Sequence, residues 1–173
     1  MKIPHNVYQE KEILKLPQEK LRHLCYEVSR LISENPKTMV QYSPLRILKF
    51  MHDGITIVIT DKESNKLIGF VKTYRWGSHQ GRIYLEIGSL IVDKKYRGHG
   101  IGHFLVREAL LYAKNLHQNA YVFAVVRLIN QPSLHLFKSI GAIEKPIPQF
   151  LGIPDKRVVP SVGFDLTNLI TSE

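Results

Sequence analysis

One cysteine, Cys25, is the whole thiol content of this 173-residue sequence. A single cysteine excludes an internal disulfide and any zinc site built from several cysteines. The sequence also lacks an apolar run near the roughly 18 residues that a membrane-spanning helix needs, and residues 1–6 lack the apolar stretch of a secretion signal. We therefore expect a cytoplasmic protein with no membrane association, in which Cys25 packs as an apolar thiol on a buried helix face.

Several common site motifs are missing as well. No Gly-Lys-Ser/Thr marks a nucleoside triphosphate site, and no Gly-x-Ser-x-Gly marks a hydrolase nucleophile. The dinucleotide fingerprint would need a glycine where His103 or Leu105 stands. His99 and His103 are four residues apart, but no glutamate follows His99 and no third ligand suggests itself. We expect no metal site.

The charge is unbalanced, with 24 lysines and arginines against 15 acidic residues and a formal net charge of +9. A surface of this kind attracts polyanions, including nucleic acid and the phosphates of a cofactor. The basic residues are nevertheless spread along the chain, and no basic tail or arginine-rich block occurs. Nucleic acid therefore stays a possible partner that the sequence does not favour.

Hydrophobic periodicity predicts the order of the helices and strands. We expect helices at 17–35, 100–116 and 130–140, a short helical turn at 44–49, and strands at 55–60, 67–76, 82–92, 121–126 and 158–166. Three prolines predict a long, semi-rigid loop at 145–157. The order predicts a mixed α/β fold, and the length predicts a single domain over residues 1–173.

A turn with three alternating glycines, Gly98, Gly100 and Gly102, joins an expected strand to an expected helix. The first amide groups of a helix have no intrahelical partner and lie at the positive end of its dipole. Glycines let a phosphate approach those amides closely, and Arg97 adds a positive charge. The turn is therefore suited to a diphosphate, although a helix that simply starts after a glycine-rich turn is the alternative.

The longer pattern around this turn, Arg97-Gly98-His99-Gly100-Ile101-Gly102, fits Arg/Gln-x-x-Gly-x-Gly/Ala. It resembles the acetyl-coenzyme A signature of the GNAT superfamily of N-acetyltransferases. The run "NQPSLHLFKSIGA", some thirty residues later, is similar to the family's second cofactor-binding helix, and the resemblance covers about residues 55–145. It implies a central mixed, mostly antiparallel sheet flanked by helices, with splayed strands that hold acetyl-CoA.

The resemblance also implies roles for individual residues. The backbone of the glycine turn would bind the pyrophosphate, the end of the preceding strand would pair with the pantetheine arm, and the second helix would contact that arm. The implied cofactor-binding residues are Leu90, Ile91, Val92, Arg97, Gly98, His99, Gly100, Ile101, Gly102, Asn130 and Ser133. The candidates for binding the nucleotide phosphate are Lys94, Lys95 and Lys138, and the alternative for each is a solvated surface lysine.

Glu86 is the expected catalytic residue. It stands between Leu85 and Ile87 in a strand with one face on the core, where a glutamate is unusual without a purpose. An amine must lose a proton during acyl transfer, and a carboxylate can accept it directly or through water. The family often places its general base at this point. The alternative is a structural ion pair with Arg75 or Arg82.

One position departs from the family pattern. The tyrosine that protonates the departing thiolate would fall at position 137, which is Phe137. Tyr84, Tyr121 or water could replace it, or the thiolate could leave unassisted because a thiol has a pKa of roughly 8.5.

We expect an N-acetyltransferase that moves acetyl from acetyl-CoA to a primary amine of a small molecule or protein. A non-catalytic acetyl-CoA sensor and a basic nucleic-acid-binding protein are the alternatives. The sequence leaves the acceptor open, together with the choice between monomer and homodimer. The acceptor cleft is expected to involve the first helix and the 145–157 loop.

Overall fold

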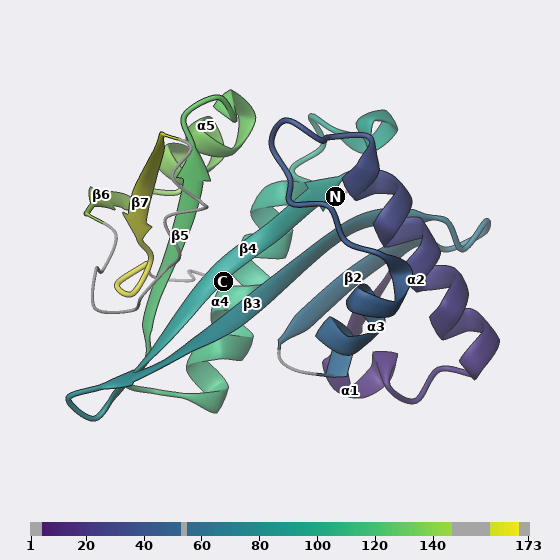
Figure 1. Ribbon diagram of the computed structural model, residues 1–173, viewed down its shortest axis with the longest axis horizontal. Helices are drawn as coiled ribbons and strands as arrows, with labels where there is room; N and C mark the ends of the chain where they lie inside the picture. Colours follow the sequence, from purple (N-terminus) through teal and green to yellow (C-terminus); the bar gives the residue numbers. More distant parts are fainter. Residues whose placement is uncertain (1–4, 53–54, 147–159, 170–173) are drawn as a thin grey trace.

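The computed structural model describes residues 5–52, 55–146 and 160–169. They form one seven-stranded sheet in the order β1-β2-β3-β4-β5-β7-β6 (Figure 1). Neighbouring strands are antiparallel except for β4 and β5, which are parallel. The strands are β1 His5–Gln9, β2 Thr56–Asp61, β3 Leu67–His79, β4 Arg82–Val92, β5 Tyr121–Arg127, β6 Ile143–Lys145 and β7 Ser161–Asp165.

Helices cover both faces of this sheet. The helices are α1 Glu10–Ile13, α2 Gln18–Ser33, α3 Pro44–His52, α4 Ile101–Leu116 and α5 Gln131–Ser139, and a short 3-10 helix, η1, spans Lys94–Tyr96. One core forms where α1, α2 and α3 pack on Val58, Phe70 and Ile91. The other forms where α4 and α5 pack on the opposite face, against residues such as Leu85 and Val122. The mixed α/β fold with helices flanking a mostly antiparallel sheet is confirmed.

The expected buried stripe of the first long helix is also present. Cys25 is 2% exposed on α2, and its thiol donates to Met51 Sδ at 3.8 Å. Burial raises the pKa of Cys25 to about 11, so the thiol stays protonated and unreactive near neutral pH. Cys25 is therefore a core residue, as expected.

Several elements differ from the prediction. The helical turn expected at 44–49 is a longer helix, α3, because Ile47 and Met51 lie one turn apart and are both fully buried. The strand β1 was not predicted, since its sequence, HNVYQ, is half-buried throughout and does not alternate. The short strand β6 was missed too, and most of the loop expected at 145–157 lies outside the described residues.

The divergence of β4 from β5 is the feature that shapes the site. These strands are paired only from Tyr84 to Glu86 on β4, and beyond that point they separate (Figure 1). A bulge in β4 lies just after the last pair, because its register against β3 shifts between Gly88 and Ile91. Ser89, at the bulge, has a φ of 48°. The strands are therefore splayed, as the resemblance implied, and the backbone of β4 is locally redirected.

Within the described residues, no helix is long and apolar enough to cross a membrane.

Candidate active site

Two adjoining cavities lie where β4 and β5 separate. The larger has a volume of about 540 Å³ and extends from the end of β4 to the glycine turn and α5. The smaller, of about 110 Å³, lies beside Glu86. The two share Thr38, Met39, Leu90, Asn130 and Ser133, so a long ligand in the first can place its end in the second.

The glycine turn forms one end of the larger cavity. Gly98 and Gly100 have φ angles of 79° and 77°, which side-chain-bearing residues rarely adopt, and each faces open space. Gly100 also caps the N-terminus of α4. The backbone can therefore be approached closely where the helix presents its unpaired amides, which is the requirement for binding a phosphate.

The third glycine of the motif has a different role. A Cβ atom on Gly102 would lie 2.6 Å from Leu136 Cδ1 on α5, well inside van der Waals contact. Gly102 therefore permits the close packing of α4 against α5. Ile101 is 1% exposed and contributes its side chain to the core, so only its backbone is available to a ligand.

Arg97 and His99 fold back onto the turn itself. Arg97 Nε donates to the Val92 carbonyl at 3.0 Å, and its Nη2 donates to Asn35 Oδ1 at 3.3 Å. The guanidinium thus joins the turn to the end of α2 while still lining the larger cavity. His99 Nδ1 lies 2.9 Å from the Arg97 carbonyl, and the exposed ring does not line either cavity.

The remaining predicted cofactor residues lie along the walls. Leu90, Ile91 and Val92 line the larger cavity from β4. Asn130 and Ser133 line it from α5, where the Asn130 side chain caps the helix by accepting from the Ser133 amide at 3.4 Å.

The three lysines proposed for the nucleotide phosphate stay outside both cavities. Lys94 and Lys95 are exposed on η1, and Lys138 pairs with Glu144 at 2.8 Å.

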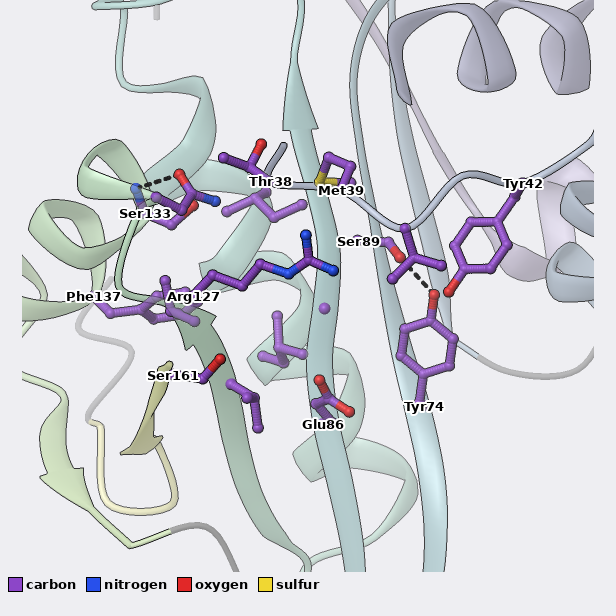
Figure 2. Close-up of a pocket in the computed structure, with 17 residues that line it drawn as sticks. Thr38, Met39, Tyr42, Tyr74, Glu86, Ser89, Arg127, Ser133, Phe137 and Ser161 are labelled. Carbon is purple, nitrogen blue, oxygen red and sulfur yellow. Dashed lines mark hydrogen bonds between the residues drawn. The ribbon is translucent and has the colours of Figure 1, made fainter. Parts of the chain in front are cut away.

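Glu86 lies in the wall of the smaller cavity and is 4% exposed (Figure 2). Its carboxylate accepts a hydrogen bond from Trp76 Nε1 at 2.6 Å. Its side chain shares a sheet face with Gly88, and a Cβ on that glycine would lie 3.4 Å from Glu86 Oε1. The glycine therefore leaves room beside the carboxylate on the side of the diverging strands.

Two tyrosines that sequence reasoning missed face the same cavity. Tyr74 is directly opposite Glu86 in the β3–β4 pairing, and its hydroxyl lies 2.5 Å from Ser89 Oγ (Figure 2). Tyr42 approaches from the segment between α2 and α3. Burial, followed by the influence of the Tyr42 hydroxyl, raises the pKa of Tyr74, which keeps its hydroxyl protonated. Alternation along β3 could have placed Tyr74 on the face of Glu86, but nothing local indicated Tyr42.

Comparison with known proteins identifies this arrangement. A model of the acetyltransferase (GNAT) family matches residues 20–142, which is more than half of the chain. The chain belongs to the GNAT acetyltransferase family.

Solved structures of acetyltransferases share the fold at low sequence identity. A GNAT-family acetyltransferase from Staphylococcus aureus Mu50 is 13% identical, with a TM-score of 0.69 over 94% of this chain and 99% of that one. The NatC complex bound to Gag peptide and CoA gives 19% identity, a TM-score of 0.68 and coverages of 94% and 96%. Arabidopsis thaliana NAA60 in complex with acetyl-CoA is 17% identical, with a TM-score of 0.66 over 93% of this chain and 97% of that one. The GNAT architecture inferred from the sequence is therefore confirmed.

Phe137 occupies the position at which the sequence resemblance implies a tyrosine. Phe137 is 3% exposed, lines the smaller cavity and stacks on Phe164 with ring centroids 5.5 Å apart. Tyr84 and Tyr121 lie together where β4 and β5 are still paired, and neither lines a cavity. The residues with hydroxyl groups that line the smaller cavity are Thr38, Tyr42, Tyr74, Ser89, Ser133 and Ser161.

The described part of this GNAT acetyltransferase contains no group of three or more His, Cys, Asp or Glu residues arranged to hold a metal ion.

Proposed function

We propose that this enzyme transfers an acetyl group from acetyl-CoA directly to a primary amine, with Glu86 as the general base. The observation that carries the proposal is the position of Glu86. It is the one carboxylate among the described residues that line the smaller cavity, and that cavity joins the larger one at Leu90, Asn130 and Ser133. A cofactor held in the larger cavity would present its acetyl group beside this carboxylate.

Different parts of the chain would contact the diphosphate and the pantetheine arm of acetyl-CoA. Backbone amides from Gly98 to Gly102 would bind the diphosphate at the N-terminus of α4. The β4 backbone at Leu90–Val92 is not paired with β5, so its free groups can pair with the pantetheine amides. Asn130 and Ser133 would contact the arm from the opposite wall.

The chemistry requires a neutral amine, whereas a free alkyl amine has a pKa of roughly 10 and is mostly protonated at pH 7. Glu86 would take a proton from the ammonium group, directly or through water, so that the neutral amine attacks the acetyl carbonyl, the C–N bond forms, and the C–S bond of the thioester breaks. The Trp76 indole donates to one carboxylate oxygen, so it fixes the orientation of Glu86.

The departing thiolate has no tyrosine at position 137 to protonate it. Transfer from Tyr74 is uphill, because burial raises its pKa above the ordinary value while an alkyl thiol has a pKa of roughly 8.5. We propose that the thiolate departs with a hydrogen bond at most and takes its proton from water. Tyr74 then holds Ser89 at the bulge.

The test is thiol release from acetyl-CoA with mixtures of primary amines, followed by mass spectrometry of the amine products. We expect release that depends on the amine, together with an acetyl-CoA-dependent rise in melting temperature, because a ligand of the native state stabilises it by mass action. A rise in melting temperature with no thiol release for any amine would favour the non-catalytic sensor. The absence of both thiol release and a rise in melting temperature would contradict cofactor binding itself.

A further inference from the structure

The arginine at the end of β5 enters the smaller cavity from the wall opposite Glu86. Arg127 lines this cavity but not the larger one. Figure 2 shows its side chain running from β5 toward β4, so that the guanidinium lies between Glu86 and the pair Thr38 and Met39. The group therefore lies on the acceptor side of the site, away from the glycine turn.

The guanidinium of Arg127 is only partly used by the protein. Its Nη1 donates to the Lys37 carbonyl at 2.9 Å, and no carboxylate within the described ranges pairs with it. By contrast, Arg30 pairs with Glu27 and Glu34. An arginine has five N–H donors in a planar fork that matches a carboxylate. One bond to a carbonyl leaves most of that fork available.

The surroundings of Arg127 favour an anion. Ser161 on β7 is its direct partner in the β5–β7 pairing, and Ser161 and Thr38 both line the same cavity. Glu86 is the cavity's one carboxylate among the described residues, and it is assigned to the amine. A negatively charged ligand group thus has the Arg127 guanidinium to bind it, whereas the amine has the Glu86 carboxylate.

We propose that Arg127 binds a carboxylate carried by the acceptor, so that the substrate class is a primary amine with a carboxylate close to it. This inference rests on the proposed function. The cavity volume of about 110 Å³ sets the spacing. Since one water molecule needs roughly 10–15 Å³ of such a cavity, the space holds on the order of ten groups of that size, and the acetyl end of the cofactor takes part of it. The amine and the carboxylate must therefore be separated by only a few bonds.

Two sources share this chemistry: a free amino acid, and a polypeptide whose first residue is aspartate or glutamate. The experiment uses matched pairs from each source. The first arm compares α-amino acids with their α-carboxamides, and the second compares peptides beginning with Asp or Glu with peptides beginning with Asn or Gln. Each pair is measured with the wild type and with Arg127→Gln, so that differences in amine pKa cancel in the ratio.

We expect the carboxylate member of one arm to be preferred by the wild type. Arg127→Gln should lower its kcat/KM roughly ten- to hundredfold through KM, as expected for the loss of a charged hydrogen bond, and should leave the amide member nearly unchanged. For the carboxylate member, kcat/KM of Arg127→Lys should lie between the values of the wild type and Arg127→Gln, because lysine keeps the charge but lacks the planar fork of donors. Arg107→Gln, which removes a charge from the exposed face of α4, is the matched control and should change neither member.

Equal losses for both members of every pair would overturn the proposal, because they would show that Arg127 only holds the segment at Lys37. A raised KM for acetyl-CoA with unchanged acceptor selectivity would overturn it as well. Calorimetric binding of the same pairs to the CoA-loaded protein provides a second readout. If the wild type turned over no amine but still bound the carboxylate members through Arg127, the proposed reaction would fail while the carboxylate site stood.

Discussion

The two walls of the active-site cleft are built in different ways. The cofactor wall consists of the end of β4, the glycine turn and the start of α4, which are nearly continuous in sequence from Leu90 to Gly102. The acceptor wall combines Tyr42, Tyr74, Glu86 and Arg127, which come from a connecting segment and three different strands. The first wall offers mainly backbone groups, and the second offers mainly side chains.

This difference explains which part of the function can be recognised. Backbone binding of a diphosphate needs glycines at fixed spacing, so it leaves a short motif in the sequence. An acceptor site needs only that some side chains reach one point, and the chain can supply them from many places. The donor site can therefore be recognised from a motif, whereas the acceptor has to be inferred from the side chains that the fold brings together.

The largest effect should come from the acceptor wall, at Glu86. Glu86→Gln keeps the size and the hydrogen bond with Trp76 but cannot accept a proton, so we expect turnover at pH 7 to fall on the order of 10²-fold or more. The loss should shrink toward pH 10, because the amine then arrives already neutral. Turnover is measured from pH 6 to 10 with saturating amine.

Binding of acetyl-CoA serves as the control for Glu86→Gln and should be unchanged. A deficit that stays constant across the pH range would assign Glu86 to structure or substrate binding. The acceptor wall would then lack the general base that we assign to it.

The next largest effects should separate two glycines on the cofactor wall. In Gly102→Ala the new Cβ meets Leu136, so we expect the free energy of unfolding to fall by about 1–3 kcal/mol, as for an overpacked core. In Gly100→Ala the space is open, and the positive φ costs about 1 kcal/mol. Denaturant unfolding with and without acetyl-CoA measures both.

The two variants should rank in the opposite order when the stabilisation by acetyl-CoA is compared. Gly100→Ala should lose more of the acetyl-CoA-induced stabilisation than Gly102→Ala, because the new methyl group at Gly100 points into open space at the turn, whereas the one at Gly102 points at Leu136. Equal loss of ligand response in the two variants would show that the turn acts as one structural unit.

The smallest effect should be that of Tyr74→Phe. If Tyr74 only holds Ser89 at the bulge, turnover should fall less than tenfold, and the alkaline side of the pH profile should keep its shape. The raised pKa of Tyr74 also predicts a stability effect. The unfolded chain ionises this tyrosine near pH 10 and the folded chain ionises it higher, so wild-type stability should decline as pH rises above about 10.

Tyr74→Phe should show less of this alkaline decline when unfolding is followed from pH 8 to 11. Loss of the alkaline limb of activity in Tyr74→Phe would instead identify Tyr74 as the acid, and the thiolate would then not leave unassisted.

The sequence was sufficient to predict the helices and strands that have a clear hydrophobic periodicity. The long apolar strands and α2 follow directly from spacing, and the glycine turn follows from its motif. By contrast, β1 is half-buried throughout and joins the sheet by pairing with β2, and no local sequence pattern predicts this strand. Gly102 was assigned to phosphate binding because the motif contains it, and its contact with Leu136 depends on the tertiary packing of α5. Arg127 could not be found, because its position beside Glu86 depends on how far two strands diverge.

The divergence of β4 and β5 also places a pair of edges in the middle of a sheet. Edges attract further strands, and proteins usually keep them short or covered. Here the interior edge is short, because β4 extends only from Ile87 to Val92 beyond its last pair with β5. Acetyl-CoA bound along β4 would fill this gap as a temporary strand. Amide hydrogen exchange at residues 87–92 of β4 should therefore slow when the cofactor is bound, while the paired residues 84–86 change little.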